Sequence, residues 1–252
     1  MKKIILMVMI LILGGCAHRN PLSDMQFQTV NVPPYVVAGW YKIQAVGEPV
    51  KIYIEGDGSA FDDQGHPTDN PTPKGTFMRE LAAGDPSPNV VYLGRVCQYL
   101  KTRACKQADW TTGRFAAPII DSMDRAVVGF MKKARTNQVV LIGFSGGAQV
   151  SGLIAARRPE QVKKWITIGG VLDQRAWTAY HGDQPLTESL NLADQAEKVR
   201  AIPQIHYVGG RDDVVPAELV ERFAGADRVV VVPRGGHGVG LASVYDEIYE
   251  VR

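Results

Sequence analysis

The segment Gly143-Phe144-Ser145-Gly146-Gly147 contains the residues best suited to do chemistry. It has G-x-S-x-G spacing and lies between an apolar run and a helical pattern. A serine in such a turn is held in a strained backbone conformation, and flanking glycines admit the neighbouring chain without Cβ clashes. The turn also places the hydroxyl and the next N–H at a helix N-terminus, where developing negative charge is stabilised. Ser145 is therefore the candidate nucleophile, and the N–H of Gly146 is a candidate oxyanion donor.

A serine hydroxyl is a poor nucleophile unless a base takes its proton and a carboxylate orients that base. Of the five histidines, His181, His206 and His237 follow Ser145. His237 lies in a glycine-rich turn after the last apolar run, where a mobile imidazole could reach the serine. His206 begins an apolar run, which favours a packed structural role. We therefore expect His237 to be the base.

Two adjacent aspartates, Asp212 and Asp213, follow another apolar run and precede Pro216. Adjacent side chains point in different directions, so only one of them could bond the imidazole. Either could instead occupy a turn or cap the helix that Pro216 introduces, and Asp213 fits that second role well. The residues alone leave the choice of acid open.

Alternating strands and helices must position these residues. Continuously apolar runs, such as 139–142 and 229–232, are typical of strands buried on both faces of a parallel sheet. The pattern predicts an α/β architecture with a mostly parallel central sheet flanked by helices. We expect strands at 35–45, 50–54, 90–96, 138–143, 165–168, 205–208 and 228–232. We expect helices at 116–135, 149–158 and 216–223, with a short one near 76–82.

These motifs together resemble the α/β-hydrolase superfamily, in which the nucleophile, the acid and the histidine follow in that order. The family's acid loop commonly has a glycine, two residues, an aspartate and, three residues later, a proline. Matching this spacing to Gly209 and Pro216 selects Asp212 over Asp213. The resemblance thus implies a triad of Ser145, Asp212 and His237 on a single-domain α/β-hydrolase fold.

The same resemblance identifies an oxyanion loop at residues 54–58, after an early strand. Many esterases have His-Gly-x-Gly there, and the match implies that Asp57 supplies the second N–H beside that of Gly146. The chain departs from this pattern because Glu55 replaces the histidine. An aspartate carboxylate would also oppose a nearby oxyanion unless it turned away. A simple Gly-Asp-Gly turn is the alternative.

Residues 110–115 and 172–177 are similar to segments of uncharacterised bacterial α/β-hydrolase lipoproteins. Residues 172–200 occupy the place where this fold inserts a cap, and they are too few and too polar for a large apolar lid. Trp177, Tyr180 and His181 could wall a substrate pocket there, or pack the cap on the core. The short cap favours a small or medium acyl substrate.

The N-terminus has the order of a secretory signal. Lys2 and Lys3 precede an apolar run at 4–13, which is too short for a permanent membrane span. Residues 13–16 resemble the lipobox of bacterial lipoproteins, which implies cleavage before Cys16 and its acylation. An ordinary signal followed by a free thiol is the alternative. Ala17, where the family pattern can have Asp, indicates the outer membrane facing the periplasm.

We therefore expect a signal peptide at 1–15, a lipidated tether at 16–34 and one folded domain at 35–252. Cleavage of the signal peptide removes Lys2 and Lys3 and lowers the formal net charge from +2 to 0 (2 − 2 = 0). An uncharged mature chain does not suit nucleic-acid binding. The remaining Cys97 and Cys105 predict a disulfide in an oxidising compartment. They lack the neighbouring ligands that a zinc site needs.

The sequence thus predicts a lipid-anchored serine hydrolase that acts on carboxylic esters through an acyl-serine intermediate. No metal, organic cofactor or obligate protein partner is expected, because neither a dinucleotide-binding nor a phosphate-binding glycine motif is present. An amide substrate, an acyltransferase with the same triad, and a non-catalytic binding lipoprotein are the alternatives.

Overall fold

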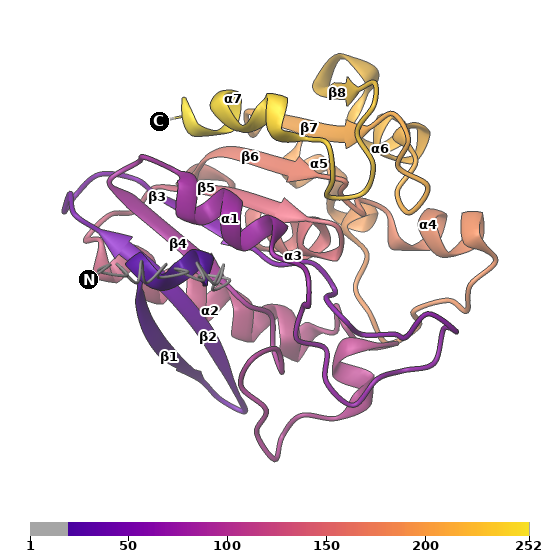
Figure 1. Cartoon of the computed structure of the whole chain (residues 1–252), viewed down its shortest axis with the longest axis horizontal. Coiled ribbons are helices and arrows are strands. Elements are labelled where there is room, and N and C mark those ends of the chain that lie inside the picture. The colour runs from indigo at the N-terminus through magenta and orange to yellow at the C-terminus, as the bar shows by residue number, and fades with distance from the viewer. Residues whose placement is uncertain (1–19, 252) are drawn as a thin grey trace, which may run out of the picture.

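The structure is a computed structural model that describes residues 20–251 and contains an eight-stranded sheet (Figure 1). The strand order is β1-β2-β4-β3-β5-β6-β7-β8. The β1–β2 and β2–β4 pairs are antiparallel, and all other neighbours are parallel. The strands are β1 (Gln26–Val32), β2 (Tyr35–Ile43), β3 (Val50–Ile54), β4 (Asn89–Leu93), β5 (Val139–Phe144), β6 (Val162–Ile168), β7 (Gln204–Gly209) and β8 (Val229–Val232).

Helices cover both faces of this sheet. One face packs against α2, α3 and α6 in the larger apolar cluster. The other packs against α1 and α7, with Leu22 of a short N-terminal 3-10 helix, in the smaller cluster. The α-helices are α1 (Phe77–Gly84), α2 (Ala117–Lys133), α3 (Gly146–Ala155), α4 (Gln174–His181), α5 (Ala196–Val199), α6 (Ala217–Ala224) and α7 (Tyr245–Tyr249). The short 3-10 helices are Pro21–Asp24, Gln107–Trp110, Pro159–Gln161, Leu192–Gln195, Ala226–Arg228 and Ala242–Val244.

The folded part begins earlier than the expected boundary at Tyr35. Gln26–Val32 forms the edge strand β1, which pairs with β2 along its whole length. The two prolines that suggested a tether, Pro33 and Pro34, instead form the turn between these strands. The polar composition of β1 arises because an edge strand leaves one face to solvent. The tether expected at 16–34 is therefore wrong from residue 21 onward.

The structure joins Cys97 and Cys105 by a disulfide in the segment that follows β4. The expected signal peptide and Cys16 lie outside the described residues. Within residues 20–251, every helix is too short or too polar to span a lipid bilayer.

Candidate active site

The candidate residues gather where the parallel strands end. Ser145 follows β5, Asp212 follows β7 and His237 follows β8. Because carboxyl ends of parallel strands meet at one edge of a sheet, three segments distant in sequence become neighbours there. This edge is therefore the place to look for chemistry.

Ser145 lies in the sharp turn between β5 and α3. Its backbone has φ 51° and ψ −124°, a conformation that a residue with a Cβ rarely adopts. Backbone hydrogen bonds hold it there: its N–H donates to Ile168 at 3.0 Å, and its carbonyl accepts from Ala148 and Val171 at 3.0 and 3.1 Å. The strain projects the side chain away from the sheet, as a nucleophile requires.

The glycines around Ser145 are needed because the turn packs against backbone. A Cβ at Gly143 would come within 2.5 Å of the Gly147 carbonyl oxygen. A Cβ at Gly147 would come within 2.5 Å of the carbonyl oxygens of both Ile54 and Glu55. The spacing of the motif is thus explained by close approach of β3, β5 and α3.

Asp212 and His237 are joined by a hydrogen bond of 2.8 Å between Oδ2 and Nδ1. The Asp212 side chain is fully shielded from solvent. Its other oxygen, Oδ1, accepts from the N–H groups of Val214 and Val215 at 3.0 and 2.7 Å. Those two donors fix the carboxylate, and the carboxylate in turn fixes the orientation of the imidazole.

Asp213 is exposed, and its side chain has no hydrogen bond within residues 20–251. It also does not cap α6, which begins without a side-chain cap. His206 is fully buried and contacts Thr167 Oγ1 at 2.8 Å. Burial, aided by Arg228, lowers the pKa of His206 to about 3, so it stays neutral. The structure thus places Asp212 and His237 together and keeps Asp213 and His206 apart from them.

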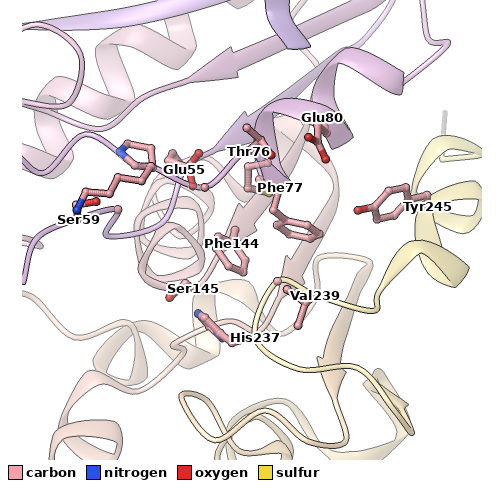
Figure 2. Close-up of a pocket in the computed structure, with 16 residues that line it drawn as sticks. Glu55, Ser59, Thr76, Phe77, Glu80, Phe144, Ser145, His237, Val239 and Tyr245 are labelled. Carbon is pink, nitrogen blue, oxygen red and sulfur yellow. The ribbon is translucent and has the colours of Figure 1, made fainter. Parts of the chain in front are cut away.

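Figure 2 shows the His237 imidazole beside Ser145 at one end of a cavity of about 560 Å³. The Ser145 hydroxyl has no hydrogen bond within the described part of the chain, and catalytic contacts of this kind often tighten only when substrate binds. The rings of Phe144 and His237 are 4.9 Å apart. Phe77 of α1 and Tyr245 of α7 also line this cavity.

Gly169, which directly follows β6, is a site residue that the sequence motifs did not reveal. It has φ 51°, and a Cβ there would lie 3.0 Å from both Asp212 Oδ2 and His237 Nδ1. A side chain at this position would therefore collide with the acid–base pair. The only sequence signal was a Gly-Gly pair directly after an apolar strand.

The segment at residues 55–58 lies against the Ser145 turn. A Cβ at Gly56 would be 3.2 Å from the Cβ of Ser145, and Gly58 has φ 64°. The N–H groups of Asp57 and Gly146 have no acceptor within residues 20–251. Two unpaired donors beside the serine are what an oxyanion site requires.

The Asp57 carboxylate is held between two arginines that the sequence motifs did not reveal. Its Oδ1 pairs with Arg95 Nη1, and its Oδ2 lies 3.3 Å from Arg114 Nε. Burial alone would raise the pKa of Asp57, but the positive charges of Arg114 and Arg95 outweigh it and hold the pKa below its usual value. The two arginines therefore offset the repulsion that the Asp57 carboxylate would exert on a nearby oxyanion.

Glu55, which replaces the histidine of the esterase pattern, is buried behind the same loop. Its Oε1 accepts from the Gly56 N–H at 2.9 Å, and its Oε2 accepts from the Tyr92 hydroxyl at 2.5 Å. The Tyr92 and Tyr99 hydroxyls are 2.7 Å apart. Burial raises the pKa of Glu55 in spite of these hydrogen bonds. The carboxyl group therefore fixes the start of the loop and retains a proton more readily than a free glutamate.

Glu55 should make stability fall as the pH rises. As the pH rises, Glu55 loses its proton in the unfolded chain before it does so in the folded protein. Between the ordinary and the raised pKa, the folded state therefore binds more protons than the unfolded state. The free energy of unfolding falls across that pH interval. Urea unfolding of Glu55→Gln from pH 4 to 8 should show a weaker decline than the wild type. Glu160→Gln, at an exposed position, is the matched control and should decline as the wild type does. Parallel curves for Glu55→Gln and the wild type would contradict the assignment.

The three residues expected to wall a substrate pocket lie on α4. Trp177 Nε1 donates to the Val214 carbonyl at 2.7 Å, and His181 Nε2 lies 2.9 Å from the same oxygen. Tyr180 is 53% exposed and stacks edge-on against His181. None of the three lines the cavity at Ser145, whose walls come instead from residues near α1 and α7. The structure uses α4 to brace the loop that carries Asp212.

Solved structures share this architecture at low sequence identity. A Pyrococcus horikoshii acylaminoacyl peptidase has 14% identity and a TM-score of 0.63, over 90% of this chain and 40% of that one. Est1E from Butyrivibrio proteoclasticus has 13% identity and a TM-score of 0.61, over 89% and 94%. An alpha-beta serine hydrolase homologue from Coxiella burnetii has 15% identity and a TM-score of 0.55, over 89% and 94%.

The chain spans less than half of the acylaminoacyl peptidase, so it shares only part of that protein. No curated protein sequence matches it. A family model described as "Serine hydrolase (FSH1)" matches residues 102–245, a span that includes the turn at Ser145, Asp212 and His237. The expected α/β-hydrolase fold is confirmed.

Proposed function

Since this chain belongs to the FSH1 serine hydrolase family, we propose that it hydrolyses small or medium carboxylic esters through an acyl-serine intermediate. The observation that carries this proposal is the 2.8 Å hydrogen bond between Asp212 and His237 beside a serine held at φ 51°. A base oriented by a buried carboxylate next to a strained serine is the arrangement that activates a hydroxyl nucleophile.

In the first step, Ser145 Oγ attacks the ester carbonyl carbon while His237 Nε2 takes the hydroxyl proton. The carbonyl oxygen becomes an oxyanion, which the N–H groups of Gly146 and Asp57 stabilise. When the tetrahedral intermediate collapses, the C–O bond to the alcohol breaks and His237 returns the proton to that alcohol. Asp212 holds the imidazolium throughout. Water then repeats the sequence on the acyl-serine and releases the acid.

The cavity supports a substrate of modest size. Its volume of about 560 Å³ lies within the range of small-molecule sites, and Phe77, Phe144 and Tyr245 give it aromatic walls. Est1E, which has the same fold over almost its whole length, has been solved with ferulic acid bound. An ester with a short aliphatic or aromatic group therefore fits the proposal better than a long-chain triglyceride.

We also propose that the mature protein is attached to a bacterial outer membrane through acylated Cys16, facing the periplasm. The support is the lipobox-like sequence at 13–16. The disulfide between Cys97 and Cys105 agrees with an oxidising compartment. The described domain begins within a few residues of Cys16, which would keep the enzyme close to the bilayer surface.

A fluorophosphonate probe tests the proposed chemistry. Purified protein should gain one adduct, and peptide mass spectrometry should place it on Ser145. Ser145→Ala should not be labelled. His237→Ala should be labelled only at about the background rate. Ser23→Ala, at an exposed position far from the cavity in sequence, is the control for the change itself and should label normally. Labelling at another residue, or equal labelling with and without His237, would overturn the proposal. Product analysis with added alcohols would separate hydrolysis from acyl transfer.

A further inference from the structure

Arg114 is a buried cation whose hydrogen-bonding groups are not satisfied by the protein. The residue is 4% exposed. Its Nε is completely shielded and has no hydrogen-bond acceptor within residues 20–251, and no acceptor contacts its two Nη groups. Its nearest anionic atom, Asp57 Oδ2, lies 3.3 Å from Nε. Buried polar groups are nearly always hydrogen-bonded, so a guanidinium left in this state indicates a missing acceptor.

Two arginines compete for one carboxylate in this cluster. Arg95 and Arg114 contribute two positive charges, and Asp57 contributes one negative charge. Arg95 is already occupied, because Nη1 pairs with Asp57 and Nη2 donates to the Arg114 carbonyl at 2.7 Å. Two guanidinium groups therefore share the single Asp57 carboxylate, and Arg114 carries the donors that have no acceptor within residues 20–251.

This cluster touches the nucleophile turn. A Cβ at Gly146, the residue after Ser145, would overlap the Asp57 carboxylate and would lie 3.0 Å from Arg95 Nη1. The charge of His237 also acts on Asp57. The cluster thus adjoins the Ser145 turn through Asp57 and Arg95, and it is separate from the aromatic cavity wall formed by Phe77 and Tyr245.

Aromatic rings fix the direction of the Arg114 guanidinium. Its Cζ lies 5.5 Å from the centre of the Trp177 ring, 5.6 Å from Phe115 and 5.9 Å from Phe61. Phe61 is 41% exposed, so this group of three aromatic rings around Arg114 reaches the protein surface. The two Nη atoms also have no partner among the described residues, but unlike Nε they are not completely shielded. Solvent therefore reaches the guanidinium at its Nη end. A guanidinium held in this way is preorganised for a planar anion.

Building on the proposed esterase activity, we propose that the substrate carries a carboxylate that pairs with Arg114 while its ester carbonyl lies at Ser145. The carboxylate accepts from the Nη groups and pairs with the guanidinium. One part of the substrate then occupies the aromatic cavity, and the acidic part extends toward Arg114. Monoesters of dicarboxylic acids and esters of hydroxy acids are the substrate class that this geometry selects.

Two matched ester series test the inference on the wild-type protein. The acyl series compares p-nitrophenyl monoesters of glutarate and adipate with the neutral valerate and hexanoate esters. The leaving-group series compares acetate esters of 4-hydroxybenzoate and of its methyl ester. We expect kcat/KM to favour the acidic member in at least one series by about tenfold or more. The absence of a preference for the acidic member in both series would overturn the inference.

Arg114→Gln then assigns the preference to the residue. The ratio of kcat/KM for acidic over neutral esters should fall by about 10- to 100-fold, mostly through KM, because a hydrogen bond to a charged group is lost. Arg114→Lys should recover part of it. Arg175→Gln on α4, where Arg175 pairs with Asp194 at the surface, should leave the ratio unchanged. A purely structural role would lower both kcat/KM values together and leave the ratio unchanged, which would contradict the inference.

The two levels of proposal fail in different ways. If fluorophosphonate does not label Ser145 and no ester is hydrolysed, the esterase proposal fails. If neutral esters are hydrolysed and Ser145 is labelled, but no series shows a charge preference, only the assignment of Arg114 fails. Should Arg114→Gln not fold, the wild-type comparison still decides.

Discussion

Replacing Asp212 by Asn should lower kcat for ester hydrolysis by about 10³- to 10⁴-fold, whereas Asp213→Asn should leave it within about twofold. Asp212 bonds His237 Nδ1 at 2.8 Å, and an amide there no longer stabilises the imidazolium. It also lets the ring adopt the wrong tautomer. Asp213 is exposed and has no partner in the described structure. Initial rates on p-nitrophenyl butyrate, normalised to folded protein, measure both variants.

The two variants control for each other, because they make the same chemical change at adjacent positions. Thermal unfolding should show that Asp212→Asn is folded, since the amide oxygen still accepts from Val214 and Val215. Equal loss in both variants would indicate a general disturbance of the loop. A large loss in Asp213→Asn alone would show that the acid has been assigned to the wrong residue.

Gly147→Ala should destabilise the protein by about 3 kcal/mol or more, or prevent folding. The added methyl group would lie 2.5 Å from two carbonyl oxygens of β3 and its following loop, and backbone atoms of a central strand have no room to move. Differential scanning calorimetry measures the change in Tm, and the soluble yield shows whether the variant folds.

Gly129→Ala is the matched control, and its effect should have the opposite sign. Gly129 is an exposed position within α2, and an added Cβ there meets nothing within 4 Å. Alanine is favoured over glycine in a helix interior by about 1 kcal/mol, so this variant should melt slightly above the wild type. A Gly147→Ala protein with an unchanged Tm would show that the turn at Ser145 is less tightly packed than its geometry requires.

The central sheet could be predicted from sequence because its strands are buried on both faces. Runs such as Val139–Phe144 are continuously apolar and begin with β-branched valines, a pattern typical of strands buried in a parallel sheet. The edge strand β1 was missed for the opposite reason. Gln26–Val32 is mostly polar, so the alternation of buried and exposed side chains is weak in its sequence. The pair of prolines that follows it also suggests a loop.

The helix after Ser145 starts three residues earlier than expected, at Gly146 rather than residue 149. Its first residues, Gly146 and Gly147, have low helix propensity, so the sequence pattern does not include them. A Cβ at Gly147 would meet the carbonyl oxygens of Ile54 and Glu55, and a Cβ at Gly146 would meet the Asp57 carboxylate, so only glycine fits at these two positions. Tertiary contacts therefore decide this boundary, and no local pattern carries that information.

The proposed nucleophile, acid and base have local signatures, but their surroundings do not. Gly169 fits beneath Asp212 and His237 only because β6 lies between β5 and β7. Arg95 and Arg114 follow β4 and precede α2, and each is an ordinary charged residue in its own segment. Their significance depends on a shared contact with Asp57, which exists only once the chain has folded. The cavity walls from α1 and α7 were missed for the same reason.

The Val214 peptide links the short cap to the triad acid. Its N–H donates to Asp212, and its carbonyl accepts from Trp177 and contacts His181 on α4. A substitution on α4 that shifts Val214 should therefore also shift the Asp212 carboxylate and the imidazole that it contacts. Directed evolution of α4 is expected to preserve turnover only when residues 212–215 change with it.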